Sequence, residues 1–185
     1  EIESGYVVEV GSDKGDKIVK EYSKLFQNAD LYKEKKEENR KNLKERLLKH
    51  VENKKIPEKD TLQALFRKKF DSELWEETAK TCVECGACNV ICPACHCFVL
   101  KDQGKDDAFE RLRLWDSCLV LSFAMVAGGA NPRKLLAQRM RNRFDKKFNF
   151  FPDAIGRFGC TGCGRCSDAC PGKIHIDEVL SKFQQ

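Results

Sequence analysis

Two short segments of the sequence carry the same arrangement of four cysteines, and this repeat limits the possible folds more than any other feature. The first run is C-x2-C-x2-C-x3-C-P, with Cys82, Cys85, Cys88, Cys92 and then Pro93. The second run has the same spacing, with Cys160, Cys163, Cys166, Cys170 and then Pro171. Two-residue spacers let three successive thiolates converge on one inorganic core, while the proline turns the fourth cysteine away from them.

This spacing is that of proteins with two [4Fe-4S] clusters, in which the fourth cysteine of each run binds the cluster of the other run. We define the first cluster site as Cys82, Cys85, Cys88 and Cys170. The second cluster site is Cys160, Cys163, Cys166 and Cys92. Shared ligation ties the two ends of the domain together, so cluster assembly is expected to contribute to folding. Zinc is the alternative, but zinc sites typically use two separated cysteine pairs.

Three cysteines and a histidine remain outside the two runs. Cys95, His96 and Cys97 follow the first run, and Cys118 begins an apolar stretch. The favoured interpretation is that these are buried thiols, which pack well and donate weak hydrogen bonds toward cluster sulfides. A third metal site on Cys95, Cys97 and Cys118 and a redox-active pair stay open as alternatives. We expect His96 to be a loop residue or a hydrogen-bond donor near a cluster.

The composition agrees with bound metal. Eleven cysteines in 185 residues, clustered and without a visible signal peptide, favour metal ligation over disulfides and predict a cytoplasmic protein. No apolar run reaches the roughly 18 residues that a membrane span needs. The formal charge is +5, but eight thiolates on two oxidised clusters would reduce the net charge to about +1. The basic balance is therefore poor evidence for nucleic acid, and no nucleic-acid partner is predicted.

The hydrophobic pattern predicts a mainly α protein in three parts. These are the end of a preceding α/β domain, a charged helical linker and a helical two-cluster domain, over residues 1–30, 31–59 and 60–185. In the first part we expect a strand over 5–10 and a helix over 18–26. Because the chain opens on Glu1 within the strand pattern, we infer that it is a piece of a longer protein.

Helical patterns also divide the third part. The expected helices cover residues 60–80, 106–115, 117–129, 132–144 and 176–183. Asp71 and Ser72 could instead cap a new turn over 73–77, because their short oxygen side chains accept from free amides. The apolar stretch at 118–130 is a candidate for a buried helix.

A basic stretch precedes the second run. Between Arg133 and Lys147 there are seven Lys or Arg residues and one acid, Asp145. One interpretation is a solvated helix face. The other is that this face offsets the negative charge of the ligated clusters and guides an acidic electron-transfer partner.

Several segments resemble a known family. They are CPACHCF, WDSC, GGANPRK, RMRNRFDKKF and GCTGCGRCSDACPGKIHI, at residues 92–98, 115–118, 128–134, 139–148 and 159–176. They are similar to the iron–sulfur subunits of anaerobic sulfite reductase (alpha) and of the sulfhydrogenases (beta). The two runs with a helical insert also resemble the α-helical ferredoxin modules of succinate dehydrogenase and heterodisulfide reductase.

The resemblance implies a non-catalytic electron-transfer subunit of an anaerobic oxidoreductase complex, placed between a flavoprotein and a catalytic subunit. It also implies that most of a preceding domain, ending in a segment like YVVEVGSDKGDKIV, is absent. No flavin or nicotinamide fingerprint is present, so any flavin is expected on a partner. Because both runs are complete, an open iron for substrate is not expected. The alternatives are a subunit of a heterodisulfide reductase-like complex and a structural iron–sulfur module.

Overall fold

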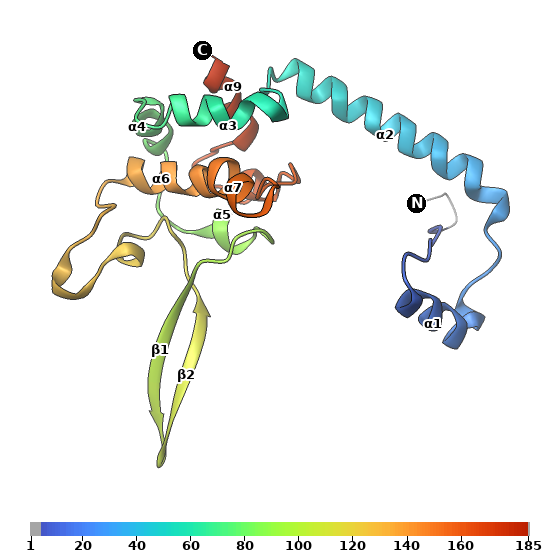
Figure 1. Ribbon diagram of the computed structural model, residues 1–185, viewed down its shortest axis with the longest axis horizontal. Coiled ribbons are helices and arrows are strands. Elements are labelled where there is room, and N and C mark those ends of the chain that lie inside the picture. The colour runs from blue at the N-terminus through green and yellow to red at the C-terminus, as the bar shows by residue number, and fades with distance from the viewer. Residues whose placement is uncertain (1–4, 185) are drawn as a thin grey trace. The chain divides into compact units, whose positions relative to one another are not determined.

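The computed structural model describes residues 5–184, except for the side chain of Lys105. The chain is mostly helical, with one two-stranded antiparallel sheet (Figure 1). It forms two compact units that divide between Asn53 and Lys54. Of the helices in the described residues, none has both the length and the apolar character needed to cross a membrane.

From residue 6 on, the regular elements of the N-terminal unit are helices and helical turns. They are α1 (Asp13–Glu21), the 3-10 turns η1 (Ser23–Leu25) and η2 (Asp30–Tyr32), and α2 (Lys33–Asn53). The predicted strand over 5–10 is wrong for residues 6–10, which form no strand; Gly5 alone has a β-bridge assignment. A strand needs a neighbour for its backbone hydrogen bonds, and the described part of this unit offers none.

Helix α1 begins at Asp13 and ends at Glu21, so it lies earlier in the chain than the helix predicted over 18–26. The amide of Gly15 donates to Oγ of Ser12 at 3.3 Å, so Ser12 caps the helix. Asp13 and Asp16 lie in the first turn, where the helix dipole favours acidic side chains. The charged segment after it is the helix α2, as predicted, and none of its residues is buried.

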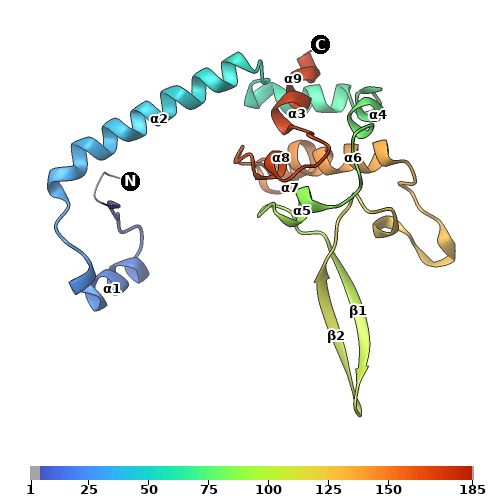
Figure 2. The same ribbon diagram turned by 180° about the vertical axis from the view of Figure 1, so that it is seen from behind.

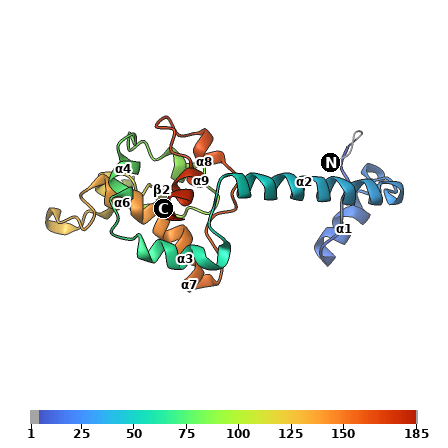
Figure 3. The same cartoon turned by 90° about the horizontal axis from the view of Figure 1, so that it is seen from above.

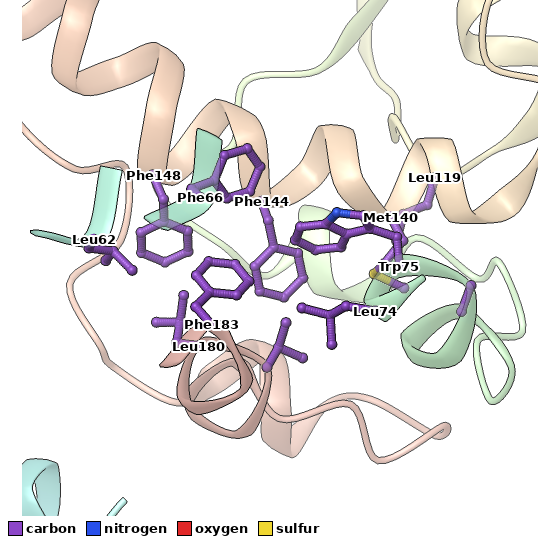
Figure 4. Packing of buried hydrophobic residues seen from close by; sticks show 12 residues of the cluster. Leu62, Phe66, Leu74, Trp75, Leu119, Met140, Phe144, Phe148, Leu180 and Phe183 are labelled. Atoms are coloured by element: carbon purple, nitrogen blue, oxygen red, sulfur yellow. The ribbon is translucent and has the colours of Figure 1, made fainter. Parts of the chain in front are cut away.

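The second unit is held by an aromatic core. Its rings come from α3 (Lys59–Lys68), α4 (Leu74–Ala79), α6 (Leu136–Asp145), the π-helical turn η5 (Lys146–Phe150) and the 3-10 turn η6 (Lys182–Gln184). Ring centroids lie 5.5 Å apart for Trp75 and Phe144, and 5.7 Å apart for Phe66 and Phe183 (Figure 4). These residues precede the first run, lie between the runs and follow the second run. The core therefore brings the two runs together.

The helix predicted over 60–80 is two helices, α3 and α4. The amide of Leu74 donates to Oγ of Ser72 at 3.2 Å, so the alternative in which Ser72 caps a new turn describes the break. The indole of Trp75 donates to the carbonyl of Lys69 at 2.9 Å across that break. The C-terminal helix α9 (Ile176–Ser181) buries Val179 and Leu180 in the same core. Figure 3 shows α3, α4, α6 and α9 gathered in this unit.

The helix predicted over 106–115 is wrong, because this segment is a strand. Strand β1 (Phe98–Lys105) pairs with β2 (Ala108–Trp115), and Phe98 lies opposite Trp115 (Figure 2). Asp106 takes a positive φ of 52° in the two-residue turn, as tight hairpins require. The Arg111 guanidinium donates twice to the Asp102 carboxylate, at 2.7 and 2.8 Å, between opposed positions of the strands.

The helix predicted over 117–129 is also wrong, as is the prediction that the apolar stretch at 118–130 is a buried helix. This segment has only the 3-10 turns η3 (Leu121–Ala124) and η4 (Ala127–Gly129), and Met125 is half exposed. Gly128 and Gly129 have φ of 83° and 78°, which ends any helix there. The helix predicted over 132–144 is confirmed as α6, although it begins later, at Leu136.

Short helices complete the second unit. They are α5 (Ala87–Val90), α7 (Phe151–Ile155) and α8 (Arg165–Asp168). Helices α5 and α8 follow Gly86 and Gly164, whose φ angles are 72° and 76°. Since α5 belongs to the first run and α8 to the second, the two runs share one local conformation.

We expect Phe144→Ala to lower the free energy of unfolding by about 3–5 kcal/mol, because a fully buried ring leaves a cavity. Phe144 has no exposed surface, and its ring contacts those of Trp75 and Phe148. Urea unfolding followed by circular dichroism measures the change. Phe109→Ala is the matched control: Phe109 is 89% exposed in the hairpin, so its removal should change stability by less than about 0.5 kcal/mol.

Candidate metal centre

One cavity of the second unit is lined by all four cysteines of the first cluster site. Cys82, Cys85 and Cys88 come from the first run, and Cys170 comes from the end of the second run. The cavity wall also contains Leu119, Met140 and Arg143. Three thiols of one run therefore lie around the same space as the fourth thiol of the other run. This is the juxtaposition that the exchange of fourth cysteines requires.

A close backbone contact brings Cys170 to this cavity. Gly172 packs so tightly against Thr81 that a Cβ on it would lie 2.2 Å from the Thr81 carbonyl oxygen. Thr81 precedes Cys82, and Gly172 follows Pro171 after Cys170. Helices α5 and α8 also pack against each other. The two runs are therefore joined both at their ends and through their short helices.

Lys147 connects the members of the second cluster site. Its ammonium group donates to Sγ of Cys92 at 3.2 Å and to the carbonyl of Gly159 at 3.1 Å. The amide of Gly159 donates in turn to the carbonyl of Lys147 at 2.8 Å. Since Gly159 precedes Cys160, these contacts hold the fourth cysteine of the first run beside the first cysteine of the second run.

The pKa shifts of the cysteines indicate the same grouping of Cys92 with the second run. Burial raises the pKa of Cys160, and nearby Cys166 and Cys92 raise it further. Burial opposes ionisation of Cys92, but a backbone hydrogen bond from Ala94 and the Lys147 ammonium group outweigh it and lower the pKa of Cys92. Cys163 is exposed at the edge of the site.

The residues around these thiols fit a bound cluster. Burial raises the pKa of Cys88 to about 11, so this thiol needs a strong cationic partner to ionise. A metal supplies one, because coordination deprotonates thiols outright. On the other side, Arg143 is only 4% exposed, and its Nε has no hydrogen-bond partner among the described residues. A buried cation of this kind favours an anionic group beside it.

The arrangement fits a cluster better than a single zinc ion. Among the described residues, no group of three or more His, Cys, Asp or Glu side chains converges tightly enough to hold one metal ion. Cluster ligands need no such convergence, because each thiolate binds a different iron and the thiolates surround the whole core. The four donors of a zinc ion must all meet one atom.

The cysteines outside the runs line a second cavity, together with Asn89, Lys146 and Lys147. Cys97 and Cys118 are buried. The Asn89 amide donates to Sγ of Cys118 at 3.1 Å and to Oγ of Ser117 at 3.0 Å. A hydrogen bond with Cys97, helped by Asn89, lowers the pKa of Cys118 to about 6. Two buried thiols thus share a hydrogen bond in this wall.

Cys95 and His96 complete that wall. The thiol of Cys95 donates to Oδ1 of Asn89 at 3.9 Å, and the His96 ring lies 5.4 Å from the Phe151 ring. The placement agrees with His96 as a residue packed beside the cluster-binding loop. The third metal site on Cys95, Cys97 and Cys118 stays a prediction.

The basic stretch is not a solvated face throughout. Arg139, Arg143 and Lys147 are 2%, 4% and 3% exposed, so for these three the solvated interpretation is wrong. Their four-residue spacing puts them on one side of α6 and η5. This spacing is the feature of the sequence from which a shared buried side could have been predicted. Asn89 is 1% exposed and lies inside the first run. Nothing in the sequence pattern indicated its role in this wall.

These features define a class of protein. A mostly helical unit with two interleaved four-cysteine runs is an iron–sulfur domain, and residues 81–174 match the family model described as "4Fe-4S dicluster domain". The chain belongs to this family, and its cofactors are two [4Fe-4S] clusters.

A curated relative narrows the comparison. The chain is 35% identical over 188 aligned positions to sulfhydrogenase 2 subunit beta of Pyrococcus furiosus. The alignment covers all of this chain and 54% of the relative, so the chain spans about half the length of that protein. The resemblance to sulfhydrogenase beta subunits is confirmed. No solved structure matches the chain.

We expect Gly172→Ala to reduce the iron content, because the added Cβ would push the end of the second run away from Thr81. The predicted loss is of a cluster at the first cluster site, measured as iron and sulfide per chain. Gly104→Ala is the control, since a Cβ there meets only the Phe109 ring, at 4.0 Å. Equal iron content in the two variants would contradict the role of this contact.

Proposed function

We propose that the chain relays single electrons through its two [4Fe-4S] clusters, between a flavoprotein partner and a catalytic subunit of an anaerobic oxidoreductase complex. The complex is of the sulfite reductase or hydrogenase type. The observation that carries the proposal is the cavity in which Cys170 faces Cys82, Cys85 and Cys88. A cluster bound there accepts and donates one electron at a time. The chain itself binds no organic substrate.

The ligand assignment is part of this proposal. Cys82, Cys85, Cys88 and Cys170 hold one cluster, and Cys160, Cys163, Cys166 and Cys92 hold the other. Leu119 and Met140 line the first cavity and are buried, so they form an apolar wall on its inner side. With four cysteines at each site, no coordination position is left for a substrate. These features favour a relay over a catalytic cluster.

The partners are proposed from two observations. The matched relative is named as a subunit of a sulfhydrogenase, so this chain is proposed to work within a complex. None of its eleven cysteines, all within the described residues, forms a disulfide, and this is the usual situation in a reducing cytoplasm. We therefore place the complex in the cytoplasm.

Paired cysteine substitutions test the exchange of fourth ligands. The unchanged chain, reconstituted without oxygen, should hold about eight irons and show two interacting reduced clusters by electron paramagnetic resonance. The variant C82A/C170A removes two ligands of one proposed cluster, so it should keep about four irons and one intact cluster. C160A/C170A removes one ligand from each proposed cluster, so both clusters should be damaged.

The reverse pattern, with one intact cluster in C160A/C170A, would show that each run keeps its own fourth cysteine. About twelve irons in the unchanged chain would establish the third site on Cys95, Cys97 and Cys118. Stoichiometric zinc would contradict the relay.

The partner assignment is tested by purifying the complex from its native source. A flavin-containing subunit and a separate catalytic subunit should copurify with this chain, and the bound flavin should reduce the clusters when its electron donor is added. If a catalytic subunit for heterodisulfide reduction copurifies instead, the chain belongs to a heterodisulfide reductase-like complex and the proposed type of complex is wrong. Isolation of the chain with no redox partner would favour a structural iron–sulfur module instead.

A further inference from the structure

Three buried cations follow one side of α6 and η5. Arg139, Arg143 and Lys147 are spaced four residues apart, and each is at most 4% exposed. A buried charge is costly unless it is paired. What each of the three is paired with therefore indicates what it does.

The charge of Arg139 is neutralised within the protein. Its guanidinium donates to Oε2 of Glu84 at 2.7 Å and to the carbonyl of Leu119 at 2.8 Å. Glu84 lies between Cys82 and Cys85 of the first run. Arg139 therefore helps to hold this loop, and with its carboxylate partner it adds little net charge.

Arg143 faces both cluster sites. It lines the cavity of the first cluster site, and Cys166 of the second site lies close enough to help raise its pKa. Burial alone would lower the pKa of Arg143, but Cys88, Cys166 and Cys95 outweigh this and raise it. No carboxylate among the described residues is paired with it. Its positive charge is therefore available to both sites.

Lys147 faces the second cluster site and the adjoining thiol of Cys95. Its ammonium group contacts Cys92 and the carbonyl of Gly159. Burial would lower the pKa of Lys147, but Cys95 and Cys92 outweigh it and raise the pKa. Within the described residues it too has no carboxylate partner. The second cluster site thus lies beside two unneutralised cations, and the first beside one.

Adding an electron to a cluster adds negative charge, so a fixed positive charge stabilises the reduced form. The effect is strong in a buried site, where water screens charges poorly. We propose, on the basis of the relay function above, that Arg143 raises the reduction potentials of both clusters and Lys147 raises that of the second alone. The second cluster is then the more readily reduced, and an electron entering at the first moves on to it.

Redox titration of the full chain, followed by electron paramagnetic resonance, tests this order. R143Q should shift both reduction steps to more negative potentials, and K147Q should shift only the step at higher potential. Glutamine keeps an N–H donor, so these variants remove charge and keep a possible hydrogen bond. R143K and K147R should restore the original potentials. In C82A/C170A, the remaining step should match the higher one.

R141Q is the matched control on the same helix. Arg141 pairs with Asp71 at 2.7 Å and lies over the Phe70 ring, 3.9 Å from its centroid. Its loss should leave both potentials unchanged. E84Q tests the idea without substituting a buried cation. It removes the carboxylate that neutralises Arg139, so the reduction potential of the first cluster should rise.

The proposal is overturned if R143Q and K147Q titrate like R141Q while retaining about eight irons. It is also overturned if K147R shifts the potential as much as K147Q, or if E84Q produces no rise. If a glutamine variant fails to retain its clusters, the potentials measured for E84Q, R143K and K147R still test the proposal. An unchanged chain without two clusters would instead overturn the relay function.

Discussion

The contact between the two cysteine runs is the constraint on which the second unit depends. The cavity of the first cluster site is lined by three cysteines of the first run and by Cys170 of the second run, without Cys92. The structure brings the two runs together with a tight backbone contact between Gly172 and Thr81 and with the packing of α5 on α8. The aromatic core is formed from helices before, between and after the runs. Folding of the core and meeting of the runs are therefore one event.

Electrostatics makes cluster binding part of that same event. Without metal, buried thiols such as Cys88 resist ionisation, while Arg143 and Lys147 remain buried without carboxylate partners among the described residues. Each set of groups is unfavourable alone. Thiolates bound to a cluster offset the cations, and the cations offset the charge of the ligated core. The unit is thus expected to gain much of its stability when the cofactors are bound.

The sequence was sufficient for the chemistry and less so for the elements around it. Spacing and the two prolines identified the cluster motifs, because ligand geometry is local. The segment 106–115 was predicted as a helix from its own hydrophobic pattern. Its strand conformation depends on pairing with residues 98–105, a relation that periodicity within one segment does not contain.

The buried cations were hidden for a different reason. Lysine and arginine are almost never fully buried, so a stretch with seven of them suggests a surface. That expectation fails here because the neighbouring thiols become negative when they bind iron. The burial of Arg143 is stabilised by the negative charge of ligated clusters, and that charge cannot be read from the sequence of its own helix. A row of basic residues at four-residue spacing beside a cluster motif should therefore be examined as a possible inner face.

The proposed exchange of the fourth ligands would also mean that the two clusters cannot be tuned independently. Cys92 and Cys170 each belong by sequence to one run and by position to the other, so a shift of either run moves ligands at both sites. In the proposal Arg143 acts on both clusters, because it lines the first cavity and its pKa is raised by Cys88 of α5 and Cys166 of α8. A difference between the two potentials must then come from a group that only one site contacts. Lys147 meets this condition through Cys92, and the first site has no equivalent because Glu84 neutralises Arg139.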